Sequence, residues 1–206
     1  MRIERLENSK RKQEHVLVHL EDGSILRITG AELLQFGLYQ GLDLTPETLA
    51  ALEAAARRSD TKRRGANMAA GRMLSKKELA SRLTKKGAAP EDAADTADWL
   101  EELGAVDDAA YAGVIVRHYG GMGYGAARVR QELHRRGVPK ELWDEALEQL
   151  PPPEEAIRKF LRTKLRGCPL TPEVSRRLAA ALQRRGFGWQ DIRPAITERG
   201  QEIDET

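Results

Sequence analysis

A basic pair followed by glycine occurs three times in this 206-residue chain at nearly constant spacing. The glycines are Gly87, Gly137 and Gly186, which are 50 and 49 residues apart. Each has a leucine four residues before it and another apolar residue four before that, which is the spacing of one helical face. Glycine directly after such a face is typical of a helix C-cap. A period of about 50 residues therefore predicts a fold built from tandem repeats.

Helical segments surround each of these glycines in the same order. Residues 75–87 form the clearest copy, because Ser75 can cap the helix start and Glu78 stands at the capping-box position. A helix is predicted before the basic helix of each unit, at 60–73, 107–119 and 154–166. Another is predicted after it, at 90–103, 139–150 and 188–198. Each repeat is therefore predicted to contain three helices, and we assign the repeats to 60–105, 106–151 and 152–206.

The N-terminal part of the chain has a different pattern. Val16, Val18 and Leu20 recur at every second position, and Asp22-Gly23 is a strong hairpin signal because the turn favours positive φ. Residues 25–28 are predicted to return as the second strand, and residues 2–6 are predicted as a third.

Two helices are expected after these strands. Residues 31–36 give one or two helical turns that end at Gly37. Thr45 followed by Pro46 signals a helix start, since threonine caps well and proline fits the first turn. We expect this helix to end near Arg58 and Asp60 to cap a separate helix of the first repeat. Residues 1–59 are therefore predicted to be an N-terminal β-hairpin and helix extension.

Charge alternates in sign with the predicted repeats. Residues 57–86 hold 11 Lys and Arg against 2 Asp and Glu, whereas residues 87–112 hold none against 8. The same alternation continues with 5 against 1 over 113–137, 1 against 6 over 138–155, 9 against 1 over 156–186, and 2 against 5 over 187–206. The first two helices of each repeat are basic, and the third is acidic.

Two interpretations of this segregation remain open. Acidic and basic helices could pair with each other inside the protein, although exposed ion pairs contribute only about 0–1 kcal/mol each. Alternatively, stacked repeats could align their basic helices into a positive stripe that attracts nucleic acid or an acidic protein groove. The candidate residues of that stripe are Arg72, Lys76, Lys77, Arg82, Lys85, Lys86, Arg117, Arg128, Arg130, Arg135, Arg136, Arg158, Lys159, Arg162, Lys164, Arg184 and Arg185.

Signals for catalysis or for a cofactor are absent from the sequence. It contains no GxxxxGK[ST] phosphate loop, and the glycine-rich run at 120–125 follows a predicted helix rather than a strand. The four histidines have no metal-ligand spacing, and Cys168 has no evident partner base. We interpret the Asp107-Asp108 pair as a helix cap. No cofactor, metal or catalytic residue is predicted.

Three further features concern packing and compartment. The three tryptophans stand at different offsets from their glycines, so we interpret them as core or inter-helix packing rather than a base-stacking set. A single cysteine fits a reducing compartment. The sequence has no apolar run long enough to span a membrane and no apolar N-terminal stretch of the signal-peptide type. We therefore expect a cytoplasmic location.

Three motifs occur in a fixed order along the chain. The first is R-x-x-S-x-x-E-L, at Arg72, Ser75, Glu78 and Leu79. The second places Leu103, Gly104, Val106, Asp107 and Asp108 before Tyr111 and Ala112. The third consists of Arg117, Gly123, Arg128, Leu133, Gly137 and Val138. This ordered set resembles the bacterial RecX regulatory proteins, closely over residues 66–150 and more faintly in the third repeat.

The resemblance implies a function that composition and spacing do not. Members of this family are non-enzymatic modulators of the RecA recombinase, which bind the RecA–single-stranded DNA filament along its groove. They limit filament growth, strand exchange and ATP hydrolysis, and so act in DNA repair, homologous recombination and the SOS response. Their fold is a curved stack of three-helix units. The expected fold is therefore mainly α, with three tandem three-helix repeats in an elongated curved stack and a small N-terminal β-hairpin extension.

The alternative is a stand-alone DNA-binding protein that uses its three-helix units like helix-turn-helix readers. A major-groove reader needs base-directed side chains at the start of its recognition helix. The second helices instead begin with Lys76-Lys77, Ala126-Ala127 and Pro172-Glu173, which share no such set. The resemblance implies the RecA filament and single-stranded DNA as partners, with double-stranded DNA as a further candidate. We expect a monomer and no membrane partner.

Overall fold

The computed structural model describes residues 1–9, 15–165 and 169–204. The chain divides into two compact units, of which the first comprises Met1–Arg72 with Leu79–Glu102 and the second Met73–Glu78 with Leu103–Thr206. The prediction of a mainly helical chain with a small N-terminal sheet is confirmed.

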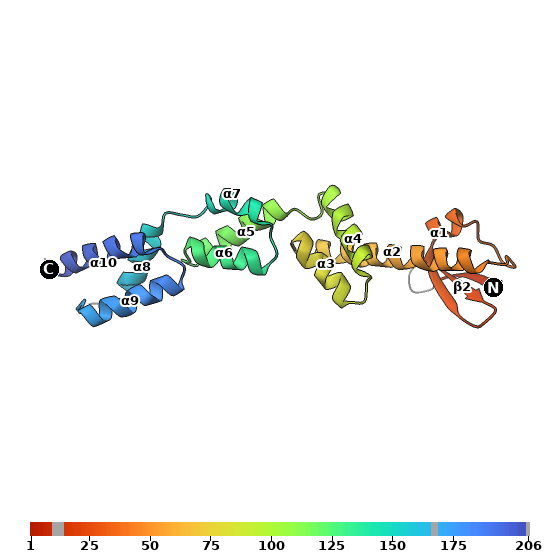
Figure 1. Ribbon diagram of the computed structural model, residues 1–206, viewed down its shortest axis with the longest axis horizontal. Helices are drawn as coiled ribbons and strands as arrows, with labels where there is room; N and C mark the ends of the chain where they lie inside the picture. The colour runs from red at the N-terminus through yellow and green to blue at the C-terminus, as the bar shows by residue number, and fades with distance from the viewer. Residues whose placement is uncertain (10–14, 166–168, 205–206) are drawn as a thin grey trace. The chain divides into compact units, whose positions relative to one another are not determined.

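The N-terminal sheet has three antiparallel strands in the order β1-β2-β3, namely Ile3–Asn8, His15–Leu20 and Ile25–Thr29 (Figure 1). The expected turn joins β2 to β3, where the Leu20 amide donates to the Ser24 carbonyl at 2.9 Å. Thr29 then caps α1, Gly30–Gln35, in a capping box with the buried Glu32. The sheet shares one apolar core with the next long helix, which contributes Leu52, and the strands contribute Ile3, Val18 and Ile28.

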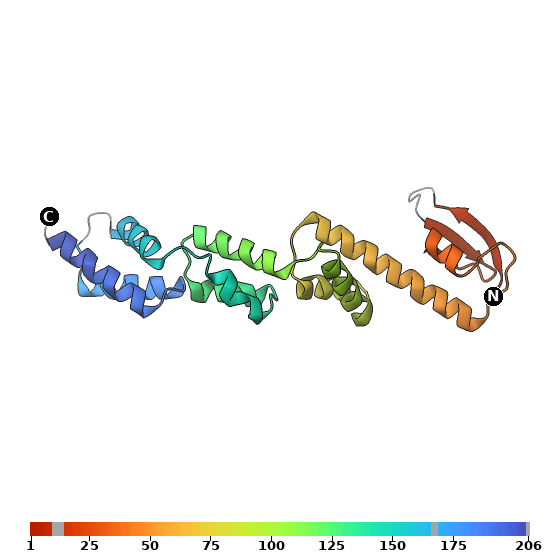
Figure 2. The ribbon, with the colours of Figure 1, turned by 90° about the horizontal axis from the view of Figure 1, so that it is seen from above.

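The long helix α2, Pro46–Gly71, corrects the prediction of a helix break near Arg58 (Figure 2). Thr45 caps its start as predicted, accepting from the Thr48 amide at 3.2 Å. Asp60 caps nothing, because its carboxylate binds Arg63 and Arg64, three and four residues later on the same helix. Such pairs stabilise a continuous helix. The boundary expected at residue 60 therefore falls inside α2.

Helix α3, Lys76–Lys85, belongs to the first unit from Leu79 onward, and α4, Pro90–Glu102, completes that unit. Leu79 and Leu83 of α3 are fully buried, as their spacing predicts. Gly65 lets α2 and α4 pack closely, since a Cβ there would lie only 2.6 Å from Cγ2 of Thr96. Trp99 of α4 is half-buried, as expected for a packing role.

The second unit contains two three-helix groups, each with its own core. The first group has α5, Asp108–Gly121, α6, Ala126–Arg135, and a short third segment made of η1, Lys140–Leu142, and α7, Trp143–Leu147. The second group has α8, Pro153–Leu165, α9, Pro172–Arg184, and α10, Trp189–Asp204. The repeated leucines Leu133 and Leu182 are fully buried in their respective cores.

Backbone hydrogen bonds join these two groups where α6 begins and α9 ends. The Gly125 amide donates to the Arg185 carbonyl at 2.9 Å, and the Ala127 amide donates to the Gly186 carbonyl at 3.1 Å. The free N–H groups at the start of one helix thereby pair with the free carbonyls at the end of another. Gly186 has a φ of +90° there, as the predicted C-cap requires.

The first turn of α3 makes a related contact within the second unit. The Ser75 hydroxyl accepts from the Glu78 amide at 3.0 Å, which confirms Ser75 as an N-cap, and donates to the Arg136 carbonyl. Asp107 caps α5 as predicted, accepting from the Ala110 amide at 2.8 Å. Asp108 instead accepts from the Lys76 amide at 2.9 Å, so this buried carboxylate caps a helix distant in sequence.

One interpretation of a tryptophan needs correction, and two predictions lie outside the described residues. Trp143 packs as expected, and its indole N–H donates to the Val138 carbonyl at 3.0 Å. Trp189 does not, because it stands at the first position of α10 and is 55% exposed. Phe187, two residues earlier, fills the core at that end instead. Cys168 and the predicted helix end at Arg166 lie outside the described residues.

Candidate nucleic-acid interface

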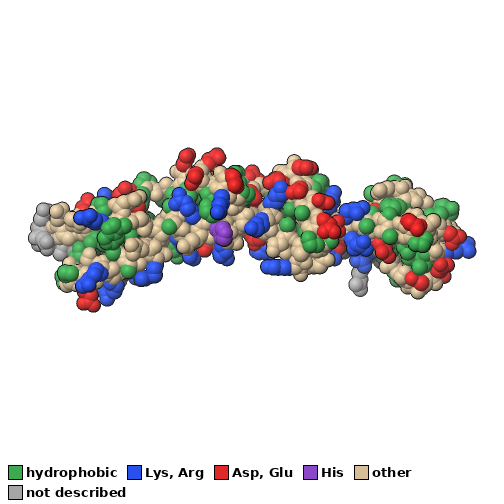
Figure 3. Space-filling view, in the orientation of Figure 1, with side chains coloured by type: hydrophobic (Ala, Val, Ile, Leu, Met, Phe, Trp, Pro, Cys, Tyr) green, Lys and Arg blue, Asp and Glu red, His purple; other side chains and the backbone are tan. Residues whose placement is uncertain are grey.

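The second unit separates its charged helices on the surface. Asp and Glu side chains gather over α7, whereas Lys and Arg side chains gather along α6 and α9 (Figure 3). Each basic helix buries one apolar stripe, Val129 and Leu133 in α6 and Leu178 and Leu182 in α9, so its cations occupy the remaining faces. The predicted basic residues differ in how far their charge is already neutralised.

Glu132 neutralises two of the predicted cations on α6. Its carboxylate is only 4% exposed and lies 3.2 Å from the Arg128 guanidinium and 2.7 Å from that of Arg135. Burial alone would raise the pKa of Glu132, but hydrogen bonds from Arg135 and Tyr119 and the two positive charges lower it below its ordinary value. The positive charges of Arg128 and Arg135 are therefore partly neutralised by a buried carboxylate of the same helix.

Two further predicted cations have acidic partners on neighbouring elements. Arg130 lies 3.8 Å from Asp144, and Arg158 lies 3.5 Å from Glu198. All four groups are about half exposed or more, so water screens both pairs and they hold these arginines only weakly. Pairing of acidic with basic helices thus accounts for part of the charge segregation.

The second arginine of each Arg-Arg-Gly motif packs inward. Arg136 donates to the Tyr111 hydroxyl at 2.6 Å and lies 5.9 Å from that ring. Arg185 donates to the Gly123 carbonyl at 3.3 Å and stacks between Phe160, at 4.9 Å, and Tyr124, at 5.5 Å. Tyr111 and Phe160 stand 49 residues apart, which is the repeat spacing. These two predicted interface residues are therefore largely engaged in packing.

The remaining predicted residues fall into two groups. Seven have side chains that are exposed and have no acidic or hydrogen-bonding partner within the described parts of the chain: Lys77, Lys85, Lys86, Lys159, Arg162, Lys164 and Arg184. The others have partners. Arg117 donates to the Gln149 side chain at 2.8 Å, and Arg72, Lys76 and Arg82 each take part in a hydrogen bond, an ion pair, a ring contact or another electrostatic interaction.

The sequence prediction missed two basic residues of α9. Arg176 and Arg177 are both exposed, and Arg177 lines a cleft with Arg184. The signal was present, since Arg177 and Arg184 are seven residues apart and therefore share a helical face. Arg176 and Arg177 are a basic pair followed by Leu178 and not by glycine, so they fall outside the repeated motif.

No group of three or more His, Cys, Asp or Glu side chains in residues 1–9, 15–165 and 169–204 is placed to hold a metal ion. Within the same ranges, no helix combines the length and the apolar character that crossing a bilayer would require.

Replacing Glu132 with glutamine is expected to lower the free energy of unfolding by about 1–3 kcal/mol at neutral pH, because a buried charged hydrogen-bond acceptor is removed. Since the folded-state pKa is lowered, the contribution of Glu132 is complete above its unfolded-state value of 4.5 and is lost as pH falls through the folded-state value. Urea unfolding at neutral and acidic pH should therefore show the difference between the two proteins shrinking in acid.

The exposed Glu148 supplies a control for that measurement. Glu148→Gln makes the same chemical change without removing a buried partner, so its unfolding free energy should match that of the parent at both pH values. A Glu132→Gln effect that stays constant with pH would mean that the Glu132 charge does not stabilise the fold.

Comparison with known proteins places this arrangement in a family. The profile of the RecX second three-helix domain matches residues 107–147, which contain α5, α6 and α7. Regulatory protein RecX of Chromohalobacter salexigens is 34% identical over 128 residues, covering 62% of this chain and 84% of that protein. Regulatory protein RecX of Geobacillus kaustophilus is 30% identical over 200 residues, covering 92% of this chain and 73% of that protein.

A solved structure shows the same fold. The crystal structure of a regulatory protein RecX superposes with a TM-score of 0.77 at 22% identity, covering 96% of this chain and 98% of the other. The three-helix architecture points to the same family as the sequence identities and the share of each relative that is covered. This chain belongs to the RecX family of regulatory proteins.

Proposed function

We propose that this protein is a non-enzymatic regulator that binds the RecA–single-stranded DNA filament and limits its growth, ATP hydrolysis and strand exchange. Membership of the RecX family carries the proposal. The protein acts as a cytoplasmic monomer without a cofactor, and its roles are in DNA repair, recombination and the SOS response. The exposed, unpartnered cations on the basic helices support the proposal, because a filament of DNA and protein presents many anionic groups.

The junctions between helices favour filament binding over base reading. A helix-turn-helix protein inserts the start of its recognition helix into the major groove. The start of α6 is occupied here, since the Gly125 and Ala127 amides bond to the end of α9. The start of α3 is similarly engaged, with the Ser75 hydroxyl on the Arg136 carbonyl.

The proposal is tested by adding substoichiometric amounts of the protein to RecA and single-stranded DNA. DNA-dependent ATP hydrolysis should fall, and the protein should sediment with the filament. A protein that leaves hydrolysis unchanged and stays in the supernatant would overturn the proposal. ATP or DNA hydrolysis by the purified protein alone would overturn its non-enzymatic part.

A charge-reversal variant tests whether the basic helices form the binding face. Lys77, Lys85 and Lys86 are exposed and lack acidic partners, so their joint replacement with glutamate should weaken filament and DNA binding. The slope of log affinity against log salt should become shallower by about 0.7–0.9 for each phosphate that the variant no longer neutralises. The same reversal at Arg27, Arg58 and Lys140, exposed residues outside the predicted face, is the matched control and should have the smaller effect.

A further inference from the structure

A cleft of about 490 Å³ lies between α8 and α9 in the second unit. Its wall on α9 is one helical face, since residues 174, 177, 181 and 184 recur at intervals of three or four. Phe160 and Lys164, one turn apart on α8, form part of the opposite wall. The apolar lining consists of Phe160, Leu165, Pro169, Val174, Leu178 and Ala181.

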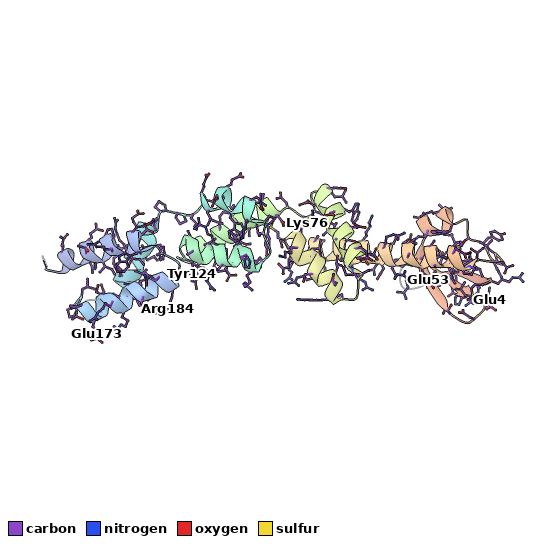
Figure 4. The ribbon with its side chains drawn as sticks, in the orientation of Figure 1. Glu4, Glu53, Lys76, Tyr124, Glu173 and Arg184 are labelled. Carbon is purple, nitrogen blue, oxygen red and sulfur yellow. The ribbon has the colours of Figure 1, made fainter. Side chains whose placement is uncertain are left out.

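Among the described residues, every charged side chain that lines this cleft is a cation. These are Lys164, Arg177 and Arg184, and none of them has a carboxylate partner among the described residues. The single acidic residue of α9 is Glu173, which lies at the opposite end of the helix from Arg184 (Figure 4). Three unneutralised cations around an apolar floor select a ligand that combines negative charge with an apolar surface.

The chemistry of the lining favours a nucleotide as that ligand. Two of the three cations are arginines, whose planar forks match phosphate oxygens in a bidentate manner. The Phe160 ring is held in place by the Arg185 guanidinium 4.9 Å from its centroid, so an apolar surface is pre-formed at little entropic cost. Aromatic and apolar side chains beside cations are the usual elements of single-strand binding.

We propose that this cleft binds single-stranded nucleic acid, with one unstacked base on the apolar floor and adjacent phosphates on Lys164, Arg177 and Arg184. The inference rests on the proposed function and adds to it a specific site and a strand preference. A duplex keeps its bases stacked inside, so it can offer phosphates to the rim but no base to the floor. The protein should therefore bind single strands more tightly than duplex.

An acidic protein segment is the competing ligand, and the composition of the cleft lining argues against it. An amphipathic peptide helix anchors through a series of apolar side chains on one face. Here the cations Lys164, Arg177 and Arg184 interrupt the apolar lining, which suits a base flanked by phosphates better than such a series.

Adjacent arginines on α9 provide the test. Arg177 lines the cleft, whereas Arg176 is exposed outside it, and Arg→Glu at either position makes the same change in charge. Fluorescence anisotropy with a labelled oligothymidylate and the full-length protein, without RecA, should show about a tenfold loss of affinity for Arg177→Glu and less than about threefold for Arg176→Glu. Ala181→Phe, which fills the cleft without changing charge, should also weaken binding of the single strand but not of a blunt duplex.

Equal losses in Arg176→Glu and Arg177→Glu would overturn the cleft and leave only diffuse attraction. Equal weakening of single-strand and duplex binding by Ala181→Phe would overturn the base-binding floor. Poly-glutamate could displace the parent protein from oligothymidylate. If it also displaces Arg176→Glu but not Arg177→Glu, the cleft binds an acidic protein segment instead. If the parent still suppresses RecA ATP hydrolysis while the cleft variants bind normally, the proposed function stands and the cleft assignment fails.

Discussion

Gly186→Ala is expected to lower the free energy of unfolding of the second unit by about 3 kcal/mol or more. Two costs combine, since φ is +90° and a Cβ there would lie 2.3 Å from the Arg128 backbone nitrogen and 2.9 Å from the Gly125 carbonyl oxygen. A left-handed conformation costs a non-glycine residue about 1–2 kcal/mol, and forcing atoms into a packed site adds about 1–3 kcal/mol. Urea unfolding, followed by circular dichroism, measures the sum.

The repeats supply a matched control for this substitution. Gly87 occupies the equivalent position and has the same φ of +90°, but a Cβ there would meet nothing within 4 Å. Gly87→Ala should therefore show only the conformational cost of about 1–2 kcal/mol. Similar losses for both variants would mean that the backbone contact between Gly186 and the start of α6 contributes little to stability.

Replacing Arg185 with alanine should lower the free energy of unfolding by about 2–3 kcal/mol, whereas replacing its neighbour Arg184 should leave stability unchanged. Arg185 supplies stacking on two rings and a charged hydrogen bond to the Gly123 carbonyl, interactions worth about 0.5–2 kcal/mol each. Arg184 is exposed and lacks an acidic partner among the described residues. Chemical denaturation of the two variants gives the comparison.

The same two variants should respond in the opposite order in a DNA-binding assay. Arg184→Ala removes a cation from the cleft, so its affinity for oligothymidylate should fall at a temperature where both proteins are folded. Its salt dependence should become shallower by about 0.7, the value for one phosphate contact on a single strand. If Arg184→Ala were destabilised and Arg185→Ala were not, Arg184 would be the packing residue and Arg185 the available cation, which is the reverse of the present assignment.

The repeat architecture was predictable because its signals are local. The glycine after each basic pair has a φ of +90°, +73° or +90°, as a left-handed cap requires wherever the helix ends. Leu83, Leu133 and Leu182 are fully buried because a helical face of fixed spacing must turn toward its neighbours. Caps such as Ser75 and Thr45 depend on a hydroxyl and an amide three residues apart, so the sequence contains the whole interaction.

The continuity of α2 was not predictable by the same reasoning. Ser59 and Asp60 are good cap residues, but in the fold Ser59 donates to Glu32 and Asp60 binds two arginines of its own helix. Local cap preference and tertiary pairing compete for the same side chains. The sequence does not show which of them prevails, because Glu32 is 27 residues away from Ser59.

What the sequence determined by itself is the set of basic helices, their period and the family to which their motifs point. What the tertiary structure decided is which cations remain available. Within one Arg-Arg pair, Arg184 is exposed and Arg185 is held between rings, although sequence treats them alike. The physical reason is that neutralisation and burial depend on which aromatic rings, carboxylates and carbonyls the fold brings within a few ångströms of each guanidinium.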